Sequence, residues 1–400
     1  MKILHITPSY EPAWELGGVV RSVSLLCRGL ARQGVDMTVF ATDRGRYGRL
    51  TVPVNQEVEL GGVKVWYFKT DFNWRFAYSR ALRDALRRSL KEYDLVNFST
   101  FWCYPGIPAG IECRKQRVPY VVFTHGTLAD YALANKHFKK KIYLKLVEER
   151  NLQFADALRY TAELEREMTA NLGLPSPTFI VPNGLDLAEF ENLPSRSHAR
   201  EKWGIDPNTQ VILYIGRLVK GKGLDLLIKA FALAERILPK ALLILAGPDS
   251  GLEKGLRKLV SSLKLESKVW FTGYVPPEKR NSLLRAADLL TLLSKGENFG
   301  NVAVEAMLAG VPVLISNKVG ICREVEADGA GVVINLNQEA VAQALIDLLS
   351  DSERLEFLGQ AAAIAARRRY DINLVSKQMV TAYEDILTGR CSQGLFWSGK

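Results

Sequence analysis

The sequence has little of what defines several protein classes. Its 400 residues include five cysteines, with no CxxC pair and no regular spacing, which argues against a disulfide framework or a zinc site. No apolar run approaches the length of a membrane-spanning helix. The opening MKILHITPSY reaches a proline too early for the core of a signal peptide. These absences predict a cytoplasmic protein with reduced thiols.

The charge balance is basic. Lys plus Arg number 53 and Asp plus Glu 43, a net charge of +10. That excess favours acidic partners such as phosphorylated ligands, anionic lipid or nucleic acid. No nucleic-acid recognition motif accompanies the charge, so we expect no nucleic-acid partner. The chain is long enough for about two domains of ordinary size.

Short apolar runs alternate with longer amphipathic ones, which is typical of parallel sheets covered by helices. Each half opens with a strand, a glycine-containing loop and a helix. The sequence therefore predicts an α/β protein with two Rossmann-like, doubly wound domains that face each other across a deep cleft. The predicted strands are 2–6, 36–41, 94–98, 120–124 and 178–182 in the first half, and 211–216, 242–247, 269–273, 289–293 and 312–316 in the second.

The predicted domains are residues 1–190 and residues 200–372. The polar stretch 189–202 lacks periodicity and contains Pro194, so we expect the linker there. A last helix, within 373–390, is expected to pack back on the first domain.

The loop GRLVKGKG opens the second domain. It brings Gly216, Arg217 and Lys222 between a strand and a helix, where backbone N–H groups and cations suit a diphosphate. The spacing is neither a Walker loop nor GxGxxG. The alternative is an ordinary basic surface loop.

The stretch ENFGNVAVE contains two carboxylates. Glu297 lies in a loop, whereas Glu305 lies in an apolar helix, where an unpaired carboxylate is costly. Acidic residues bind ribose in other nucleotide sites, so Glu305 is a candidate for ribose and Glu297 for sugar hydroxyls. A structural carboxylate that caps a neighbouring loop is the alternative for Glu305.

His125 follows a predicted strand in VVFTHGTL and so lies at a carboxyl edge, although a lone histidine is more often structural. Asn183 and Asp186 belong to VPNGLD, which is first of all a turn pattern. Their candidacy is correspondingly weaker.

Taken together, ENFGNVAVE, AMLAGVPVLIS, GRLVKGKGLDLLI, GGVVRSV, VVFTHGTL and VPNGLD resemble glycosyltransferase family 4, the group 1 transferases of GT-B fold, with their E-x7-E motif. The resemblance covers most of the chain. It implies transfer of a hexosyl group from a UDP- or GDP-linked sugar to a hydroxyl of a glycan or lipid-linked acceptor, with anomeric configuration retained. It implies no metal and no cofactor. The setting it suggests is synthesis of a surface polysaccharide or glycolipid.

The resemblance also implies roles. The first domain would bind the acceptor and the second the donor. Glu297, His125, Arg217 and Lys222 would be catalytic. The donor contacts would be Gly17, Gly18, Gly216, Arg217, Lys222, Tyr274, Val275, Glu297, Phe299, Gly300, Asn301 and Glu305. The sequence departs from the common family pattern at Asn298, which is often glycine, and Asn301 occupies a variable position; either could tune the donor sugar.

Two basic segments lie in the first domain, and a basic amphipathic helix near aromatic residues can lie on an anionic membrane surface. We therefore expect peripheral association with the inner membrane face; solvated helix faces are the alternative. The basic residues are Arg75, Arg80, Arg83, Arg87, Arg88 and Lys91, and then Lys136, Lys139, Lys140, Lys141 and Lys145.

Rival classes are a catalytically inactive sugar-nucleotide-binding relative and a nucleotide-sugar epimerase. An epimerase is not expected to combine the two glutamates with the Arg217 and Lys222 loop. A phosphorylase of the glycogen type would be far longer.

Overall fold

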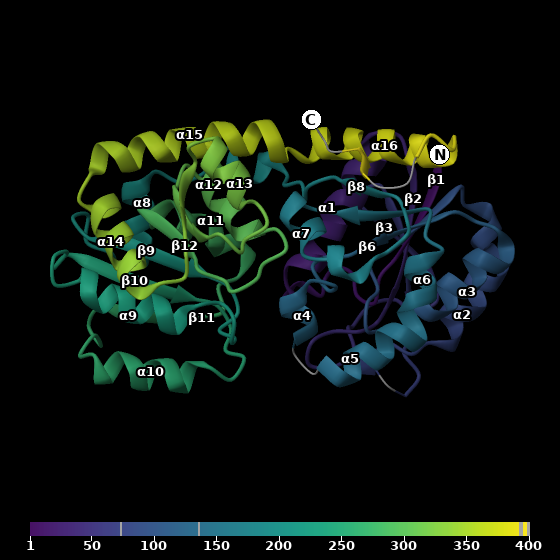
Figure 1. Ribbon diagram of the computed structural model, residues 1–400, viewed down its shortest axis with the longest axis horizontal. Helices are drawn as coiled ribbons and strands as arrows, with labels where there is room; N and C mark the ends of the chain where they lie inside the picture. Colours follow the sequence, from purple (N-terminus) through teal and green to yellow (C-terminus); the bar gives the residue numbers. More distant parts are fainter. Residues whose placement is uncertain (73, 135–136, 392–394, 398–400) are drawn as a thin grey trace. The chain divides into compact units, whose positions relative to one another are not determined.

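Two domains, each built around its own sheet, make up the chain in the computed structural model (Figure 1). The first comprises Met1–Leu185 and Ile372–Lys400, and the second Asp186–Asp371. The structure describes residues 1–72, 74–134, 137–391 and 395–397, with the side chains of 134, 137–139 and 395–397 left out.

The first domain has a sheet in the order β15-β8-β7-β6-β5-β1-β2-β4-β3, parallel except for the β3–β4 pair. The chain moves from β1 to β2 on one side and returns to β5 on the other, so the winding direction reverses between β1 and β5. The strands are β1 Lys2–Ile6, β2 Asp36–Thr42, β3 Glu57–Leu60, β4 Val63–Phe68, β5 Leu95–Phe98, β6 Tyr120–Phe123, β7 Ala157–Tyr160, β8 Thr178–Ile180 and β15 Leu395–Trp397.

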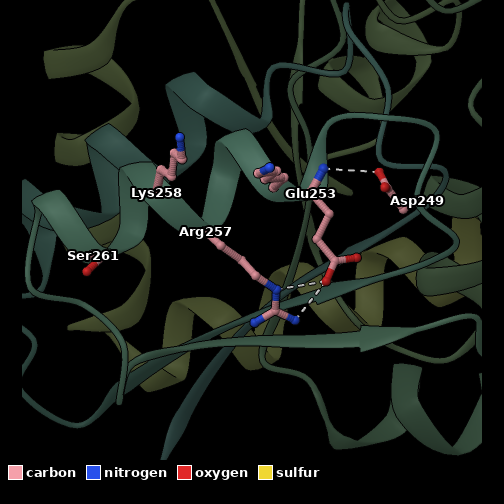
Figure 2. A pocket seen from close by; sticks show the side chains of 6 residues that line it. Asp249, Glu253, Arg257, Lys258 and Ser261 are labelled. Atoms are coloured by element: carbon pink, nitrogen blue, oxygen red, sulfur yellow. Dashed lines mark hydrogen bonds and ion pairs between the residues drawn. The ribbon is translucent and has the colours of Figure 1, made fainter.

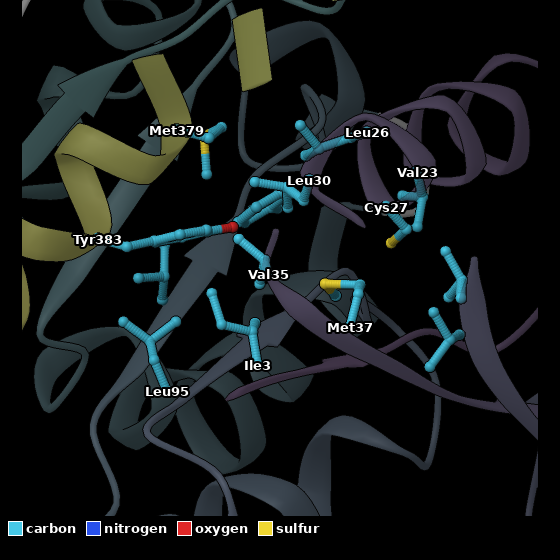
Figure 3. Close-up of a cluster of buried hydrophobic side chains, with 14 of the residues drawn as sticks. Ile3, Val23, Leu26, Cys27, Leu30, Val35, Met37, Leu95, Met379 and Tyr383 are labelled. Atoms are coloured by element: carbon cyan, nitrogen blue, oxygen red, sulfur yellow. The ribbon is translucent and has the colours of Figure 1, made fainter. Parts of the chain in front are cut away.

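Apolar side chains cover both faces of this sheet in two separate clusters. One of them joins the strands to α1 and α16, which pack on each other (Figure 3). Tyr383 of α16 reaches the sheet, where Asn97 Nδ2 donates to its hydroxyl at 2.7 Å. The helices are α1 Gly18–Arg32, α2 Arg80–Ser89, α3 Gly106–Gln116, α4 Asp130–Ala134, α5 His137–Tyr143, α6 Glu149–Gln153, α7 Glu163–Glu167 and α16 Ile372–Leu387.

The second domain has a wholly parallel sheet in the order β11-β10-β9-β12-β13-β14, which is doubly wound about β9 and β12. The strands are β9 Gln210–Ile215, β10 Ala241–Ala246, β11 Val269–Gly273, β12 Leu289–Leu292, β13 Val313–Ser316 and β14 Gly331–Ile334. The helices are α8 Arg196–Trp203, α9 Leu224–Ala234, α10 Glu253–Ser262, α11 Pro277–Ala286, α12 Asn301–Leu308, α13 Cys322–Ala327, α14 Gln338–Leu349 and α15 Ser352–Tyr370.

All of the predicted strands are confirmed to within two residues, but β3, β4, β7, β14 and β15 were not predicted. The strand β15, which follows the last predicted helix, pairs with β8.

The linker prediction for 189–202 is wrong in part, because Arg196–Trp203 is the helix α8. The Ser195 side chain caps it by accepting from the His198 N–H. Arg200, which is buried, donates to Asp288 at 2.6 Å and fixes α8 within the second domain. Polar composition concealed a helix whose stability comes from tertiary ion pairing.

Within the described chain, no helix combines the length and the apolar character needed to cross a membrane. Four cysteines are buried and Cys391 is half-buried, and none is in a disulfide.

Candidate active site

The carboxyl ends of β9 and β12 are the natural place for a ligand on the second sheet. The two strands are neighbours, and the chain winds away from them in opposite directions. Open α/β sheets bind ligands where the winding reverses in this way. The loops 216–223 and 293–300, which follow these strands, carry the predicted residues Gly216, Arg217, Lys222 and Glu297 to this point.

The two loops approach each other too closely for a side chain at Gly223. A Cβ there would lie 2.1 Å from the carbonyl oxygen of Leu293, and the φ of +70° at Gly223 favours glycine independently. Lys295 N–H donates to Gly221 O at 2.8 Å beside this contact. Glycine therefore lets the two loops form one surface.

Lys222 and Glu297 form an ion pair across that surface, with Nζ and Oε2 in direct contact. Their side chains are 23% and 20% exposed, so water screens the pair less than a fully exposed one. Arg217 is exposed, and in the described part of the chain no carboxylate pairs with it. The edge thus offers one uncompensated guanidinium beside a polar pair.

Tyr214, which was not predicted as a site residue, supports this loop from below. It is buried in β9, and its hydroxyl donates to Arg217 O at 3.0 Å. Burial raises the pKa of Tyr214, and the nearby Glu297 charge raises it further, so the phenol stays protonated and remains a donor. A lone hydroxyl within the apolar run VILYIG was the available signal.

The helix α12 starts at Asn301, with Gly300 as its N-cap. Its amino terminus therefore lies directly at the end of the 293–300 loop, where it favours negative charge or sugar oxygens. The Phe299 ring is 1% exposed and packs edge-on against Tyr370 at 5.4 Å. Phe299 can reach a ligand only through its backbone.

Glu305 is 2% exposed on α12. Its Oε1 lies 3.2 Å from a guanidinium nitrogen of Arg280 on α11. The structure thus answers why a carboxylate is tolerated in this apolar helix: Arg280 neutralises it. Arg280 was missed because the two residues are 25 positions apart and no local pattern joins them.

Tyr274 and Val275 follow β11, at the edge of the sheet rather than at its centre. Tyr274 is 53% exposed and Val275 is half-buried. Both lie at the carboxyl end of their strand, on the same edge as the loops above. An exposed aromatic face there can stack on a planar group.

Gly17 and Gly18 occupy the corresponding edge of the first sheet, between β1 and α1. Gly17 has a φ of +97°, and among the described residues no atom lies within 4 Å of a Cβ built on it. Backbone conformation rather than crowding therefore favours glycine here. The helix begins at Gly18, which is exposed.

His125 follows β6, one strand from the reversal, and takes a φ of +46°. Its Nε2 lies 2.9 Å from Ser99 Oγ, which follows β5. Ser99 Oγ also lies 2.9 Å from Nε2 of His5, a fully buried residue of β1. One hydroxyl therefore links two imidazoles from three neighbouring strands.

Both imidazoles are neutral at pH 7. Burial lowers the pKa of His5 and of His125 to about 3, and the charge of Arg159 adds to the effect. His125 therefore cannot act as a cation at neutral pH.

The hydrogen-bond chain also selects a tautomer. Of the described residues, none is bonded to His5 Nδ1, which is buried. A buried nitrogen without a hydrogen-bond partner costs less as a bare acceptor than as an N–H group. We therefore assign the His5 proton to Nε2. Ser99 then accepts from His5 and donates to His125 Nε2, which leaves the proton of His125 on Nδ1.

A buried carboxylate holds the His125 loop in place. Glu165 of α7, 1% exposed, accepts from Thr124 Oγ1 at 2.7 Å and from the Gly126 N–H on the other side of His125. It also accepts from Thr161 N–H at 2.7 Å. Neither His5, Ser99 nor Glu165 was predicted; a histidine in the buried strand KILHI was the one visible signal.

Asn183 and Asp186 have structural contacts, which fits their weaker candidacy. Asn183 Oδ1 accepts from the Arg159 guanidinium at 3.3 Å. The Asp186 side chain accepts from Ala188 N–H at 3.2 Å, as the turn pattern suggests.

A separate shallow hollow lies along α10 of the second domain (Figure 2). Its Arg257 is paired with Glu253, with Nε and Oε1 2.8 Å apart, and lies over the Phe271 ring. Glu253 N–H donates in turn to Asp249. None of the predicted site residues line this hollow.

The comparisons with known proteins agree with the two-domain architecture. Residues 16–189 match the family model described as Glycosyltransferase Family 4, and residues 195–364 match that of glycosyl transferases group 1. A D-inositol 3-phosphate glycosyltransferase of Kineococcus radiotolerans is 30% identical over 91% of this chain and 90% of its own. A GDP-mannose:cellobiosyl-diphosphopolyprenol alpha-mannosyltransferase of Xanthomonas oryzae pv. oryzae is 26% identical over 97% of both chains.

Solved structures share the fold. Sucrose-phosphate synthase from Thermosynechococcus elongatus superposes with a TM-score of 0.78 at 22% identity, over 97% of this chain and 99% of that one. Anabaena HepE, in complex with UDP and glucose, has a TM-score of 0.77 at 24% identity, over 96% and 99%. These superpositions show that the chain has the GT-B fold. The chain belongs to the group 1 glycosyltransferases, family 4.

Proposed function

We propose that this glycosyltransferase moves a hexosyl group from a nucleoside diphosphate sugar to a hydroxyl of a glycan or lipid-linked acceptor, with retention and without a metal. The observation that carries the proposal is the Lys222–Glu297 pair beside the exposed Arg217 at the β9/β12 edge. Relatives named for a GDP-mannose donor and a UDP complex support the donor class.

In the proposed reaction, Arg217 and Lys222 bind the diphosphate and stabilise the charge that develops on it as it departs. Glu297, released from part of its contact with Lys222, accepts from hydroxyls of the donor sugar. Backbone groups at Gly216 and at the start of α12 bind the same donor. Glu305, oriented by Arg280, accepts from the ribose hydroxyls.

The bond from the anomeric carbon to the phosphate oxygen breaks, and a bond to the acceptor oxygen forms on the same face. The acceptor proton passes to the departing phosphate oxygen. His125, neutral and protonated on Nδ1, donates a hydrogen bond to the sugar rather than acting as a base. Gly17 and Gly18 give the phosphate and acceptor close access to the first-domain backbone.

The test is a thermal-shift screen of UDP- and GDP-linked sugars in the presence of EDTA, because a ligand that binds only the folded state raises the melting temperature. One donor should give a shift that Arg217→Ala and Glu305→Ala abolish. Arg236→Ala, an exposed arginine of the same domain, is the matched control. A folded protein that responds to no donor, or a shift that EDTA removes, would contradict the proposal.

We also propose peripheral contact with an anionic membrane through α5 and the turn of helix after it. Ile142 and Leu146 are 44% and 76% exposed, and Lys141 and Lys145 lie exposed beside them. Ile142 and Leu146 are four residues apart, as are Lys141 and Lys145. The two apolar side chains therefore lie about one turn apart on one face of the helix, with the two lysines beside them. Lys136 and the Lys139 side chain lie outside the described residues.

The other predicted basic segment supports this contact less. Arg80 lies 3.6 Å from Asp71, Arg83 lies 3.1 Å from Asp84, and Arg87 lies 3.2 Å from Glu112. Co-sedimentation with phosphatidylglycerol vesicles at low salt should therefore be reduced by Leu146→Glu far more than by Arg80→Gln. No pelleting of the unmodified protein would exclude the contact.

A further inference from the structure

A short arginine-bearing hairpin, residues 43–50, follows β2 at the carboxyl edge of the first sheet. Gly45 N–H donates to Gly48 O at 2.8 Å, and Leu50 N–H donates to Asp43 O at 2.7 Å. Asp43, 3% exposed, accepts from both Thr70 N–H and Thr70 Oγ1. The hairpin is therefore closed on itself and fixed to the chain after β4, so its side chains are held in position.

Two of its three arginines serve that structure. Arg49 donates to Thr70 Oγ1 at 3.0 Å and to Asp71 O at 2.6 Å. Arg46 binds the turn before Gly17: its N–H donates to Glu15 Oε1 and its guanidinium donates to Glu15 O, both at 3.2 Å.

Arg44 is different, because its partner carries no charge. Its guanidinium lies 3.1 Å from Cys103 Sγ. Burial raises the pKa of the Cys103 thiol, with Arg44 opposing the shift only in part, so the sulfur remains a neutral thiol at pH 7. Across the described residues no carboxylate lies within ion-pair distance of Arg44, which is half-buried. A partly desolvated cation without a counter-charge is unfavourable unless a ligand supplies one.

The place of Arg44 in the fold is that of a ligand contact. Cys103 follows β5, Arg44 follows β2, and β1 lies between those two strands. The Arg44–Cys103 contact therefore spans the end of β1, where the winding reverses. Exposed aromatic side chains lie on the same hairpin and on the turn that it contacts. Tyr47 at the hairpin tip is 79% exposed, and Trp14, next to the Glu15 that Arg46 binds, is 37% exposed.

We propose that the hairpin 43–50 is a phosphoryl-binding subsite of the acceptor. Arg44 binds the phosphoryl group of a phosphorylated or diphosphate-linked sugar, and Tyr47 and Trp14 contact the sugar ring next to it. A planar guanidinium binds phosphate through two parallel hydrogen bonds. This assignment rests on the proposed function, because it presupposes that the first domain receives the acceptor.

The test uses the full chain saturated with UDP, so that the donor site is filled, and inorganic pyrophosphate as the probe. Hydrogen exchange of the 43–50 amides reports on the hairpin, and calorimetry gives the Kd. Pyrophosphate should slow exchange in the hairpin, and Arg44→Gln should weaken its Kd about tenfold, the loss of one charge-assisted bidentate contact. Arg117→Gln, an exposed arginine at the end of α3, should leave the Kd unchanged.

Arg44→Lys keeps the charge but cannot form the two parallel hydrogen bonds, so its Kd should lie between those of Arg44→Gln and Arg117→Gln. It replaces Arg44→Gln in the test if that variant does not fold. Unchanged exchange, or equal Kd values for Arg44→Gln and Arg117→Gln, would overturn the assignment. So would slowing by phosphatidylglycerol vesicles but not by pyrophosphate, which would make the hairpin a lipid-surface contact. UDP binding is measured in the same samples; its absence would contradict the donor proposal, not this one.

Discussion

The carboxyl edges of the two sheets handle charge in opposite ways. At the second, cations and carboxylates meet directly: Lys222 pairs with Glu297, and Arg280 with the buried Glu305. At the first, the polar chain His5–Ser99–His125 is uncharged, because burial lowers the pKa of each histidine to about 3. The difference teaches that the ends of β9 and β12 carry ionic groups that a charged ligand can compete for, whereas the ends of β1, β5 and β6 carry neutral hydrogen-bonding groups, and the charge available beside them lies in Arg44 of the hairpin after β2.

The largest effect should come from breaking the buried ion pair. Arg280→Gln removes the cation that lies 3.2 Å from the buried Glu305 carboxylate and should cost about 3–5 kcal/mol of unfolding free energy. The urea midpoint of the second domain reports it. Adding Glu305→Gln should recover most of the loss, since neither charge is then buried. Arg257→Gln breaks an exposed pair on α10 and should cost about 1 kcal/mol or less. Equal losses at Arg280 and Arg257 would mean that burial of the pair is immaterial.

Activity should depend most on the cations of the second edge. Arg217→Ala and Lys222→Ala should each lower kcat by about 10²–10³, the usual result of removing a group that stabilises the leaving charge. Initial rates with the donor identified by thermal shift provide the measurement. Arg236→Ala should retain the unmodified rate. A change confined to KM would assign Arg217 and Lys222 to ground-state binding alone.

The neutral edge predicts a pH dependence of stability. His5 has a folded pKa of about 3, against about 6.5 in the unfolded chain. Below that unfolded value the unfolded state binds a proton that the folded state does not, so stability falls as pH falls, by about 1.4 kcal/mol per pH unit. Above it His5 contributes no slope.

Urea midpoints of the first domain, measured from neutral to mildly acidic pH, test this dependence. His5→Gln should remove about half of the histidine-dependent slope, because His125 has the same lowered pKa. His198→Gln, which removes a side chain 67% exposed on α8, should leave the slope unchanged. A slope unaffected by His5→Gln would show that the imidazole is protonated or solvated in the folded state.

The smallest effect should come from Ser99. Ser99→Ala removes one neutral hydrogen bond from each histidine, and each bond is worth about 1 kcal/mol. The bond to His125 is the one that bears on activity, so kcat should fall about fivefold. Imidazole ¹⁵N shifts should show the Nδ1-protonated tautomer of His125 in the unmodified protein. In the variant they should show a mixture of the Nδ1 and Nε2 tautomers. Ser99→Thr should restore both readouts. An unmodified protein with His125 protonated on Nε2 would reverse the assigned direction of the chain.

The parts of the candidate site that could be predicted were those marked by a short local pattern in the sequence. Glycine-rich loops and a carboxylate eight residues from another carboxylate are visible in the sequence, and Glu297, Lys222 and Glu305 were predicted from them. Arg280, Tyr214 and Ser99 matter through contacts made only by the tertiary fold, so no local pattern contains them.

The missed elements divide in the same way. The β3–β4 hairpin had a signal in the sequence, since Gly61 and Gly62 form a two-residue turn between EVEL and VKVWYF. The helix α8 had little signal in the sequence, because it is polar and its buried Arg200 pairs with Asp288, which is 88 residues away. A turn between two adjacent strands can therefore be predicted from local sequence, whereas an ion pair between distant residues cannot.

The chain leaves the first domain after Leu185 and re-enters it at Ile372, and the Ile372 N–H donates to Leu185 O at 2.9 Å. The second domain is thus an uninterrupted insert whose two points of entry are already bonded to each other. Such an arrangement suits exchange of whole modules. A gene segment coding for 186–371 could be replaced by that of a relative with another donor, and the host scaffold would have no gap to bridge.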